Sequence, residues 1–113
     1  MTVNYTYNAR VTKVIDGDTL ELSIDLGFRI TTVQRARVLG IDTPEMFSGT
    51  TAERAEGKWA RSVTWNWCLA RDNIVVVTTQ KTDSFGRWLA DVKSLSGENL
   101  TEFLLSKGYK AYV

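Results

Sequence analysis

Alternating apolar and polar positions divide the first third of the chain into extended segments. Residues 10–15 and 20–24 alternate on either side of Asp16-Gly17-Asp18-Thr19, and an Asp-Gly pair between two such segments predicts a tight hairpin. Residues 28–41 form the longest extended run. Its apolar residues occupy both alternating sets of positions, which predicts a strand covered on both faces. Residues 1–8 fit either a fraying lead or an additional edge strand.

The middle of the chain has the spacing of a helix. Thr50 and Glu53 form the pattern of a capping box, and the apolar residues after them recur every three or four positions. The stripe consists of Ala55, Trp59, Ala60, Val63 and Trp67. We therefore predict a helix of about twenty residues, with Trp65 packing at the edge of the stripe.

The last third predicts two more strands and a short helix. The strands cover residues 74–78 and 87–92 and are joined by the turn from Asp83 to Arg87. Asn99 is placed to cap a helix that Gly108 ends, with Leu100, Phe103 and Leu104 on one face. The order of elements predicts a mainly β fold with helices (α+β). We expect a five-stranded Greek-key barrel of the oligonucleotide-binding (OB) type, with a central helix and a short C-terminal helix.

Length and composition fit one domain over residues 1–113, because 113 residues with 43% hydrophobic and 24% charged side chains can bury a modest core. The net charge of +1 gives no broad basic surface for nucleic acid, although a metal ion and local arginines can supply positive charge at one site. No leader or membrane-spanning segment is recognisable, so we expect a cytoplasmic monomer without membrane partners.

Two residue counts restrict the chemistry. The chain has no histidine, which excludes a histidine base, a histidine metal site and a Ser-His triad. Acid–base work must therefore fall to carboxylates, lysine, tyrosine or metal-bound water. Cys68 is the single cysteine, which excludes an internal disulfide, and its place in the helical pattern indicates ordinary packing.

The segment from Arg37 to Glu45 leads an apolar run into two carboxylates. Pro44 ends the strand and holds Thr43 in an extended conformation, so Asp42 and Glu45 leave the strand on a stiff turn. Two acids at a strand end most often form a solvated turn, and this motif alone favours that interpretation. Further charged residues at the Asp16–Thr19 and Asp83–Arg87 turns favour a functional site instead.

Three motifs together resemble the staphylococcal (micrococcal) nuclease family, also called thermonucleases. They are Asp-Gly-Asp-Thr at residues 16–19, Arg37 with Asp-Thr-Pro-Glu at residues 42–45, and Asp83 with Gly86-Arg87. The resemblance covers about Arg10 to Ala111, and the order of the motifs makes it specific. It implies an OB barrel with Ca²⁺-dependent nuclease activity on phosphodiester bonds of DNA or RNA. It also implies 3′-phosphate products and single-stranded nucleic acid as the preferred partner.

The candidate metal ligands are oxygen atoms. Asp18 and Asp42 are hard ligands on two different turns and suit Ca²⁺, and the resemblance adds the backbone carbonyl of Thr43. Asp16 is expected to contribute negative potential rather than a ligand.

The candidate catalytic residues are Glu45, Arg37 and Arg87. By resemblance Glu45 is the general base, and the two arginines offer planar forks for phosphate oxygens. Arg35 lies on the same face of the strand and rivals Arg37, but the family's spacing to Asp42 selects Arg37.

The chain departs from the family at the Asp83–Arg87 turn and at its end. Ser84 and Phe85 stand where the family commonly has a basic residue and a tyrosine, and Phe85 remains able to stack on a base. Tyr109 and Tyr112 both lie near the position of the tyrosine in the family's nucleotide pocket. The family's usual protein continues into a further C-terminal helix, whereas this sequence stops at Val113.

Two other interpretations stay open. One is a catalytically silent OB barrel that binds nucleic acid or protein, as in the nuclease-like repeats of Tudor-containing coactivators. Those repeats lack the acidic set that this chain retains. The other is a structural or regulatory phage or plasmid protein, which rests only on small size and weak charge.

Overall fold

A computed structural model describes residues 5–47, 49–82 and 86–112, and five of its strands close into a barrel. Neighbouring strands follow the order β1-β2-β3-β6-β5, and every contact is antiparallel except that between β3 and β6. This is the predicted five-stranded Greek-key barrel of OB type. The barrel strands are β1 (Thr6–Asp16), β2 (Thr19–Asp25), β3 (Thr31–Val38), β5 (Ile74–Thr82) and β6 (Trp88–Lys93).

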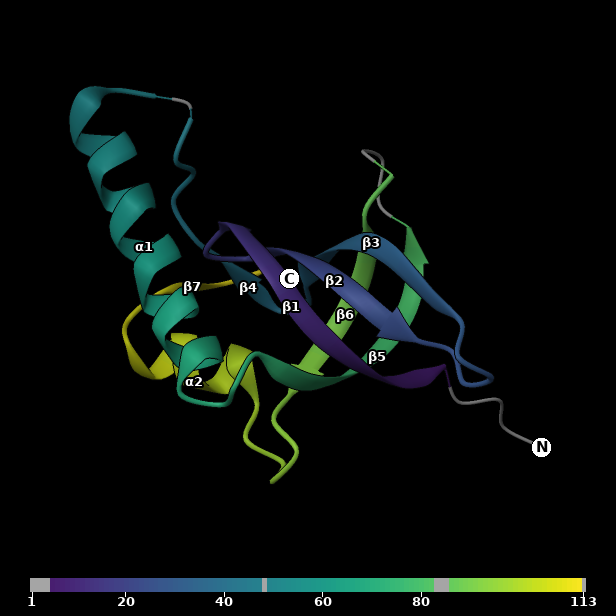
Figure 1. The fold of residues 1–113 in the computed structure, drawn as a ribbon. Helices are drawn as coiled ribbons and strands as arrows, with labels where there is room; N and C mark the ends of the chain where they lie inside the picture. Colours follow the sequence, from purple (N-terminus) through teal and green to yellow (C-terminus); the bar gives the residue numbers. More distant parts are fainter. Residues whose placement is uncertain (1–4, 48, 83–85, 113) are drawn as a thin grey trace.

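Two helices lie at one end of the barrel, and the turn between β2 and β3 lies at the other (Figure 1). They are α1 (Thr51–Leu69) and α2 (Leu100–Ser106). Both predicted caps are confirmed: Thr50 and Glu53 form a reciprocal capping box, and the Asn99 side chain accepts a hydrogen bond from the Glu102 amide. Neither helix in the described part of the chain has the length and apolar character needed to cross a bilayer.

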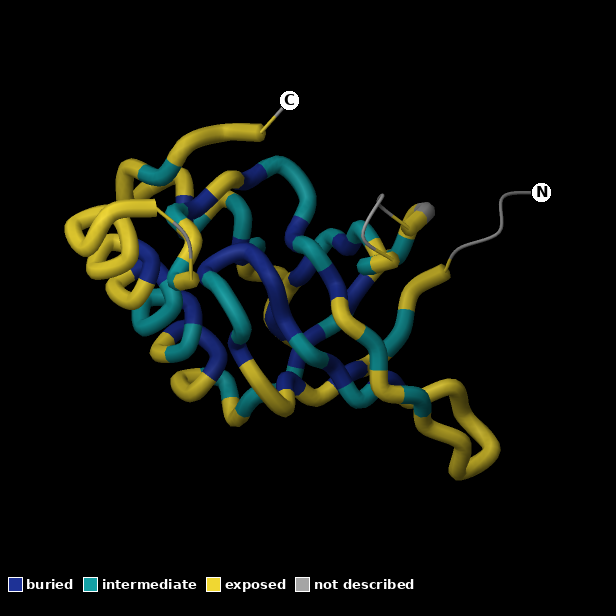
Figure 2. The backbone as a smooth tube through the Cα atoms, turned by 90° about the horizontal axis from the view of Figure 1, so that it is seen from above, coloured by how far each residue is buried: buried dark blue, intermediate teal, exposed yellow. Residues whose placement is uncertain are grey.

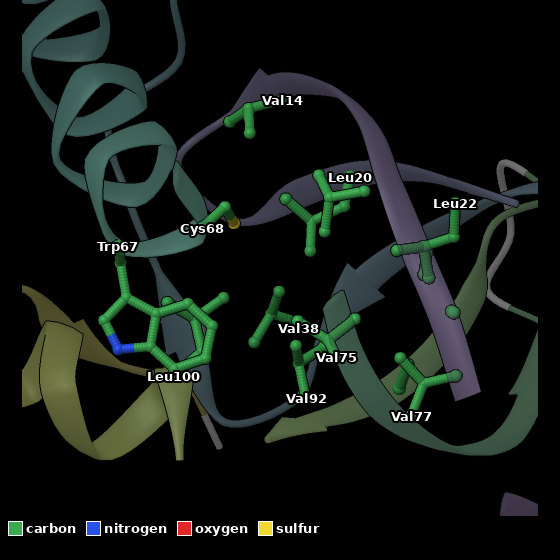
Figure 3. Close-up of a cluster of buried hydrophobic side chains, with 14 of the residues drawn as sticks. Val14, Leu20, Leu22, Val38, Trp67, Cys68, Val75, Val77, Val92 and Leu100 are labelled. Atoms are coloured by element: carbon green, nitrogen blue, oxygen red, sulfur yellow. The ribbon is translucent and has the colours of Figure 1, made fainter. Parts of the chain in front are cut away.

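The core joins the inner faces of the strands to the two helices. Val14, Leu20 and Val38 are fully buried, and α1 and α2 close the barrel end beside them with Trp67, Cys68 and Leu100 (Figure 3). Figure 2 shows the buried residues gathered in the middle of the molecule. Burial raises the pKa of the Cys68 thiol to about 12, so the thiol stays neutral and packs as an apolar group, as predicted.

The start of the chain was predicted to be either a fraying lead or an additional edge strand, and β1 decides between the two. This strand begins at Thr6, and Tyr7 pairs with Val77 of β5, so residues 6–8 extend a barrel strand. With 11 residues, β1 is also the longest strand in the described part of the chain.

The prediction of one strand over residues 28–41 is wrong at both ends. Phe28 and Arg29 adopt left-handed backbone angles in the turn before β3. Gly40, with a φ of 82°, separates β3 from β4 (Ile41–Asp42). The expected cover on both faces is also wrong, because Val33 is 61% exposed. The apolar residues of both alternating sets therefore do not indicate a strand enclosed on both sides.

The apolar stripe of α1 begins later than predicted. Its buried residues are Gly57, Ala60, Thr64, Trp67 and Cys68, whereas Ala55 is exposed and Trp59 is 69% exposed. The physical reason is that the first turns of the helix rise beyond the barrel, so their faces have no sheet to pack against (Figure 1). Trp65 packs at the edge of the core, as predicted.

A small two-stranded sheet was not predicted. It pairs Ile41 and Asp42 of β4 with Ala111 and Lys110 of β7 (Lys110–Ala111). The Tyr112 amide continues the contact by donating a 3.1 Å hydrogen bond to the Gly40 carbonyl. This sheet brings the C-terminal segment beside Asp42.

Candidate active site

The hairpin between β1 and β2 carries Asp18 in a two-residue loop closed by the pair Asp16 and Thr19. Gly17 in this loop does not have a positive φ. A Cβ atom at Gly17 would instead lie 2.7 Å from the hydroxyl of Thr43, so a larger residue has no room. The buried hydroxyl of Thr64 in α1 donates a 2.7 Å hydrogen bond to the Gly17 carbonyl. The loop is thus held between α1 and the turn that follows β4.

The carboxylates of Asp18 and Asp42 meet at one guanidinium group. Arg37 Nη2 lies 3.3 Å from Asp18 Oδ2 and 3.5 Å from Asp42 Oδ1. The Arg37 side chain is only 12% exposed, and its guanidinium carbon lies 4.5 Å from the centre of the Tyr112 ring. One positive charge therefore bridges two acids that are 24 positions apart in the sequence.

Asp18 is the more enclosed of the two acids. Burial raises the pKa of its carboxyl, and this rise is opposed by a hydrogen bond from the Thr43 amide, by Arg37 and by the Thr19 hydroxyl. The amide of Thr43 donates to Asp18 Oδ2 at 3.2 Å. The ionised form of Asp18 therefore depends on these donors and on nearby positive charge.

Arg87 reaches the same group of residues through Thr19. Its Nη1 donates a 3.2 Å hydrogen bond to the Thr19 hydroxyl, which donates at the same distance to Asp18 Oδ1. Arg87, the residue before β6, thereby brings a second guanidinium group beside the acidic hairpin.

An open groove of about 570 Å³ lies beside these residues, and we call it the arginine groove. Charged side chains of both signs line it, which is the composition expected where an anionic group is bound and a proton is moved. The lining residues are Asp16, Val33, Gln34, Arg35, Glu45, Gly86 and Arg87.

Glu45 is held at this groove through its backbone. Gly57 of α1 approaches so closely that a Cβ atom there would lie 2.2 Å from the Glu45 carbonyl oxygen. Asp16 Oδ1 accepts a 3.3 Å hydrogen bond from the next amide, that of Met46. The role of Asp16 is thus partly structural, because its hydrogen bond stabilises the turn that contains Glu45.

The predicted substrate-binding residues fall in three places. Tyr112 lies against Arg37, whereas Tyr109 lines a separate pocket of about 700 Å³ that also includes Asp42 and Trp59. Partial burial raises the pKa of the Tyr109 phenol, so its hydroxyl stays protonated at neutral pH. Phe85 lies outside the described residues.

Arg35 and Arg37 both point outward from β3, where they pair in register with Glu21 and Thr19 of β2. Arg37 contacts the acids, and Arg35 lines the arginine groove. The geometry brings both arginines to the site, so the choice between them remains a prediction.

The sequence matches the profile of the staphylococcal nuclease homologue family over residues 35–113. The chain belongs to this family. Arg37, Asp42, Glu45 and Arg87 lie within the matched residues, whereas Asp18 precedes them.

Two proteins described as uncharacterized endonucleases, from Escherichia coli O157:H7 and Escherichia coli, are each 30% identical to this chain over 101 residues. The matched region is 89% of this chain and 58% of each relative, so the chain spans less than two thirds of their length.

Three residues that position the site were missed in the sequence. The Thr19 hydroxyl hydrogen-bonds to both Arg87 and Asp18. The Thr64 hydroxyl donates a hydrogen bond to the hairpin loop, and Gly57 leaves room for the backbone of Glu45 to approach α1. A glycine in a helix interior is costly, and so Gly57 was a usable signal of close packing. Thr64, a polar residue on the buried side of α1, was a second one.

Replacing Gly57 by alanine is expected to lower both stability and turnover. Overpacking of this kind typically costs about 1 to 3 kcal/mol, against a gain of about 1 kcal/mol in helix propensity. Because the clash is with the backbone of Glu45, we expect hydrolysis to fall at least about tenfold even in the folded fraction. Urea unfolding and steady-state kinetics measure both effects.

The control for this variant is Lys58→Ala, which changes the neighbouring exposed residue of the same helix. Unchanged stability and unchanged turnover in Gly57→Ala would show that the turn carrying Glu45 is not held by this contact.

Proposed function

We propose that this protein is a Ca²⁺-dependent nuclease that hydrolyses phosphodiester bonds of DNA or RNA. Single strands are its preferred substrates and 3′-phosphates its products, as the family resemblance implies. The observation that best supports the proposal is the convergence of Asp18 and Asp42 on one cationic group beside a groove that contains Glu45 and Arg87.

The donor set fits a hard cation. Arg37 already places positive charge between Asp18 and Asp42, and the hydroxyl of Thr43 is a buried polar atom with no hydrogen-bond partner in the described part of the chain. Among the described residues no three acidic, cysteine or histidine side chains gather as a ready metal cluster. Two carboxylates with a backbone carbonyl suit Ca²⁺, which accepts oxygen ligands in flexible geometry and completes its shell with water.

Asp18, Asp42 and the carbonyl of Thr43 would hold the ion. When bound, Ca²⁺ would supply positive charge to an anionic phosphate group in the arginine groove. Arg37 and Arg87 would bind phosphate oxygens through two N–H groups each and stabilise the additional charge of the five-coordinate transition state. Glu45 would orient the attacking water and take its proton.

Neutralising either proposed ligand is expected to weaken Ca²⁺ binding. Asp18→Asn and Asp42→Asn each remove one negative charge from a site with few carboxylates, so the dissociation constant should rise at least about tenfold. Titration calorimetry measures it, and circular dichroism confirms folding. Asp72→Asn, at an exposed position away from the site, is the control. Unchanged Ca²⁺ affinity in both site variants would remove Asp18 and Asp42 from the metal site.

Release of acid-soluble nucleotides from heat-denatured DNA tests the function itself. The folded protein should release nucleotides with Ca²⁺ and stop when a chelator is added. If folded protein gives no metal-dependent release from either DNA or RNA but retains oligonucleotide binding, the barrel is a binding module and the proposal fails.

A further inference from the structure

The open end of the barrel has an unusual lining. Along each strand the inward-facing set of positions includes buried aliphatic residues, such as Val11, Val38 and Val75. Because side chains alternate along a strand, the same sets continue to the opposite end, where aromatic, hydroxyl and amide side chains join the aliphatic Ile24 and Leu26. This end surrounds a pocket of about 500 Å³, whose lining includes Tyr7, Ile24, Thr32, Gln34, Thr79 and Trp88. We call it the barrel mouth.

The chemistry of the barrel mouth differs from that of the arginine groove. Among the described residues that line the mouth, none is an acid, a lysine or an arginine, whereas the groove contains Asp16, Arg35, Glu45 and Arg87. The mouth combines the aromatic faces of Tyr7 and Trp88 with the amide of Gln34, which donates a 2.9 Å hydrogen bond to the Thr32 hydroxyl. An uncharged flat ring with an apolar face and a polar edge matches this lining better than a phosphate or an aliphatic chain does.

The two sites adjoin each other. Gln34 lines both of them. The described pairing between β3 and β6 begins only at Ala36 and Trp88, so the part of β3 before Ala36 is not paired with β6 where the groove meets the mouth. Neighbouring residues also divide between the two sites: Arg87 lines the groove, and Trp88 lines the mouth. Adjacent Cα atoms are about 3.8 Å apart, so the backbone of residues 87 and 88 forms part of the border between the groove and the mouth.

We propose that the barrel mouth is a nucleobase subsite, which accepts the base of a nucleotide whose phosphate, or a neighbouring phosphate, lies in the arginine groove. The base stacks on Trp88 and Tyr7, and Gln34 meets its polar edge. Paired bases are stacked inside a duplex, so only an unpaired base can enter. The subsite thus supplies a physical reason for preference for single strands. The inference rests on the proposed function for the identity of the ligand.

The test uses a 12-nucleotide single-stranded DNA containing 2-aminopurine, whose fluorescence falls when it stacks on an aromatic ring. Binding is measured with Ca²⁺ in a Glu45→Gln background, so that the DNA stays intact. We expect Trp88→Ala to raise the dissociation constant about 5- to 100-fold and to abolish the fluorescence quenching. Trp88→Phe should retain most of both, because a ring remains.

Tyr7→Ala provides a second variant in case Trp88→Ala fails to fold, and it should weaken binding in the same direction. Phe28→Ala is the control, since Phe28 is a 97% exposed aromatic residue outside the mouth, and it should leave binding within about twofold.

Parent-like affinity and quenching in folded Trp88→Ala and Tyr7→Ala would overturn the subsite. If the wild-type protein still cleaves DNA with Ca²⁺, that result leaves the proposed function standing. Absence of both binding and cleavage in the wild type would instead reject the proposed function, and the subsite with it. Displacement of the apolar dye ANS from the mouth by a fatty acid but not by the oligonucleotide would show a lipid-like ligand and would also overturn the proposal.

Discussion

Arg37→Lys is expected to lower turnover by about a hundredfold or more while leaving substrate affinity nearly unchanged. Lysine keeps the net charge, but its single ammonium group lacks the planar fork that binds two phosphate oxygens at once. Arg37 also lies between Asp18 and Asp42 and against Tyr112, and its position depends on these contacts. If its main role is to stabilise charge that develops in the transition state, the loss appears in kcat rather than in KM.

Arg35→Lys is the matched control, because it makes the same exchange two residues earlier on the same face of β3. We expect turnover within about threefold of the wild type. Arg35 is exposed, so its contribution at the groove depends on its positive charge, which lysine keeps, and not on a bidentate contact. Steady-state kinetics of both variants on a single-stranded oligonucleotide decide between the arginines. A large loss in Arg35→Lys together with near-normal Arg37→Lys would show that the other arginine holds the phosphate.

The order of the predicted elements and the family resemblance were sufficient for the barrel, and local signals were sufficient for both helix starts. A capping box at Thr50 and a cap at Asn99 depend only on residues within one turn, and both form as predicted. The alternation of apolar residues in β1 and β2 likewise identifies a strand pair without knowledge of the rest of the fold.

Features that depend on distant neighbours were not predictable. The left-handed Phe28 and Arg29, which delay the start of β3, are unusual in residues other than glycine. The pairing of β4 with β7 joins two-residue strands about seventy positions apart, and strands so short leave no recognisable alternation. The buried stripe on α1 starts late because the first turns of the helix lie beyond the end of the barrel. The sequence of the helix alone does not show where the barrel ends.

The candidate site was predictable to the extent that its residues belong to motifs. Asp18, Asp42 and Arg37 were selected through their motifs, and the Arg37 guanidinium group lies 3.3 Å from the Asp18 carboxylate and 3.5 Å from the Asp42 carboxylate. The residues that hold them, such as Gly57 and Thr64, act through contacts between α1 and separate loops. No pattern in the sequence reports such contacts directly, although a glycine inside a helix marks the place to look.

Glu45→Gln is expected to lower hydrolysis by about a hundred- to ten-thousandfold, the usual range for loss of a general base. Glutamine has nearly the same shape, so the contact of its backbone with Gly57 and the fold should be kept. The amide cannot accept a proton from water at neutral pH. Because Asp18 and Asp42 are unchanged, Ca²⁺ affinity should stay within about threefold of the wild type.

The central claim is that the turn from Asp42 to Glu45 catalyses phosphodiester hydrolysis in this protein. The most direct test is Ca²⁺-dependent cleavage of an end-labelled single-stranded oligonucleotide by wild type and Glu45→Gln purified in parallel, which also controls for contaminating nucleases. We predict rapid cleavage to 3′-phosphate ends by the wild type and a loss of at least about a hundredfold in the variant, with Ca²⁺ binding retained. Equal rates from the two proteins would place the catalytic activity elsewhere and contradict the claim.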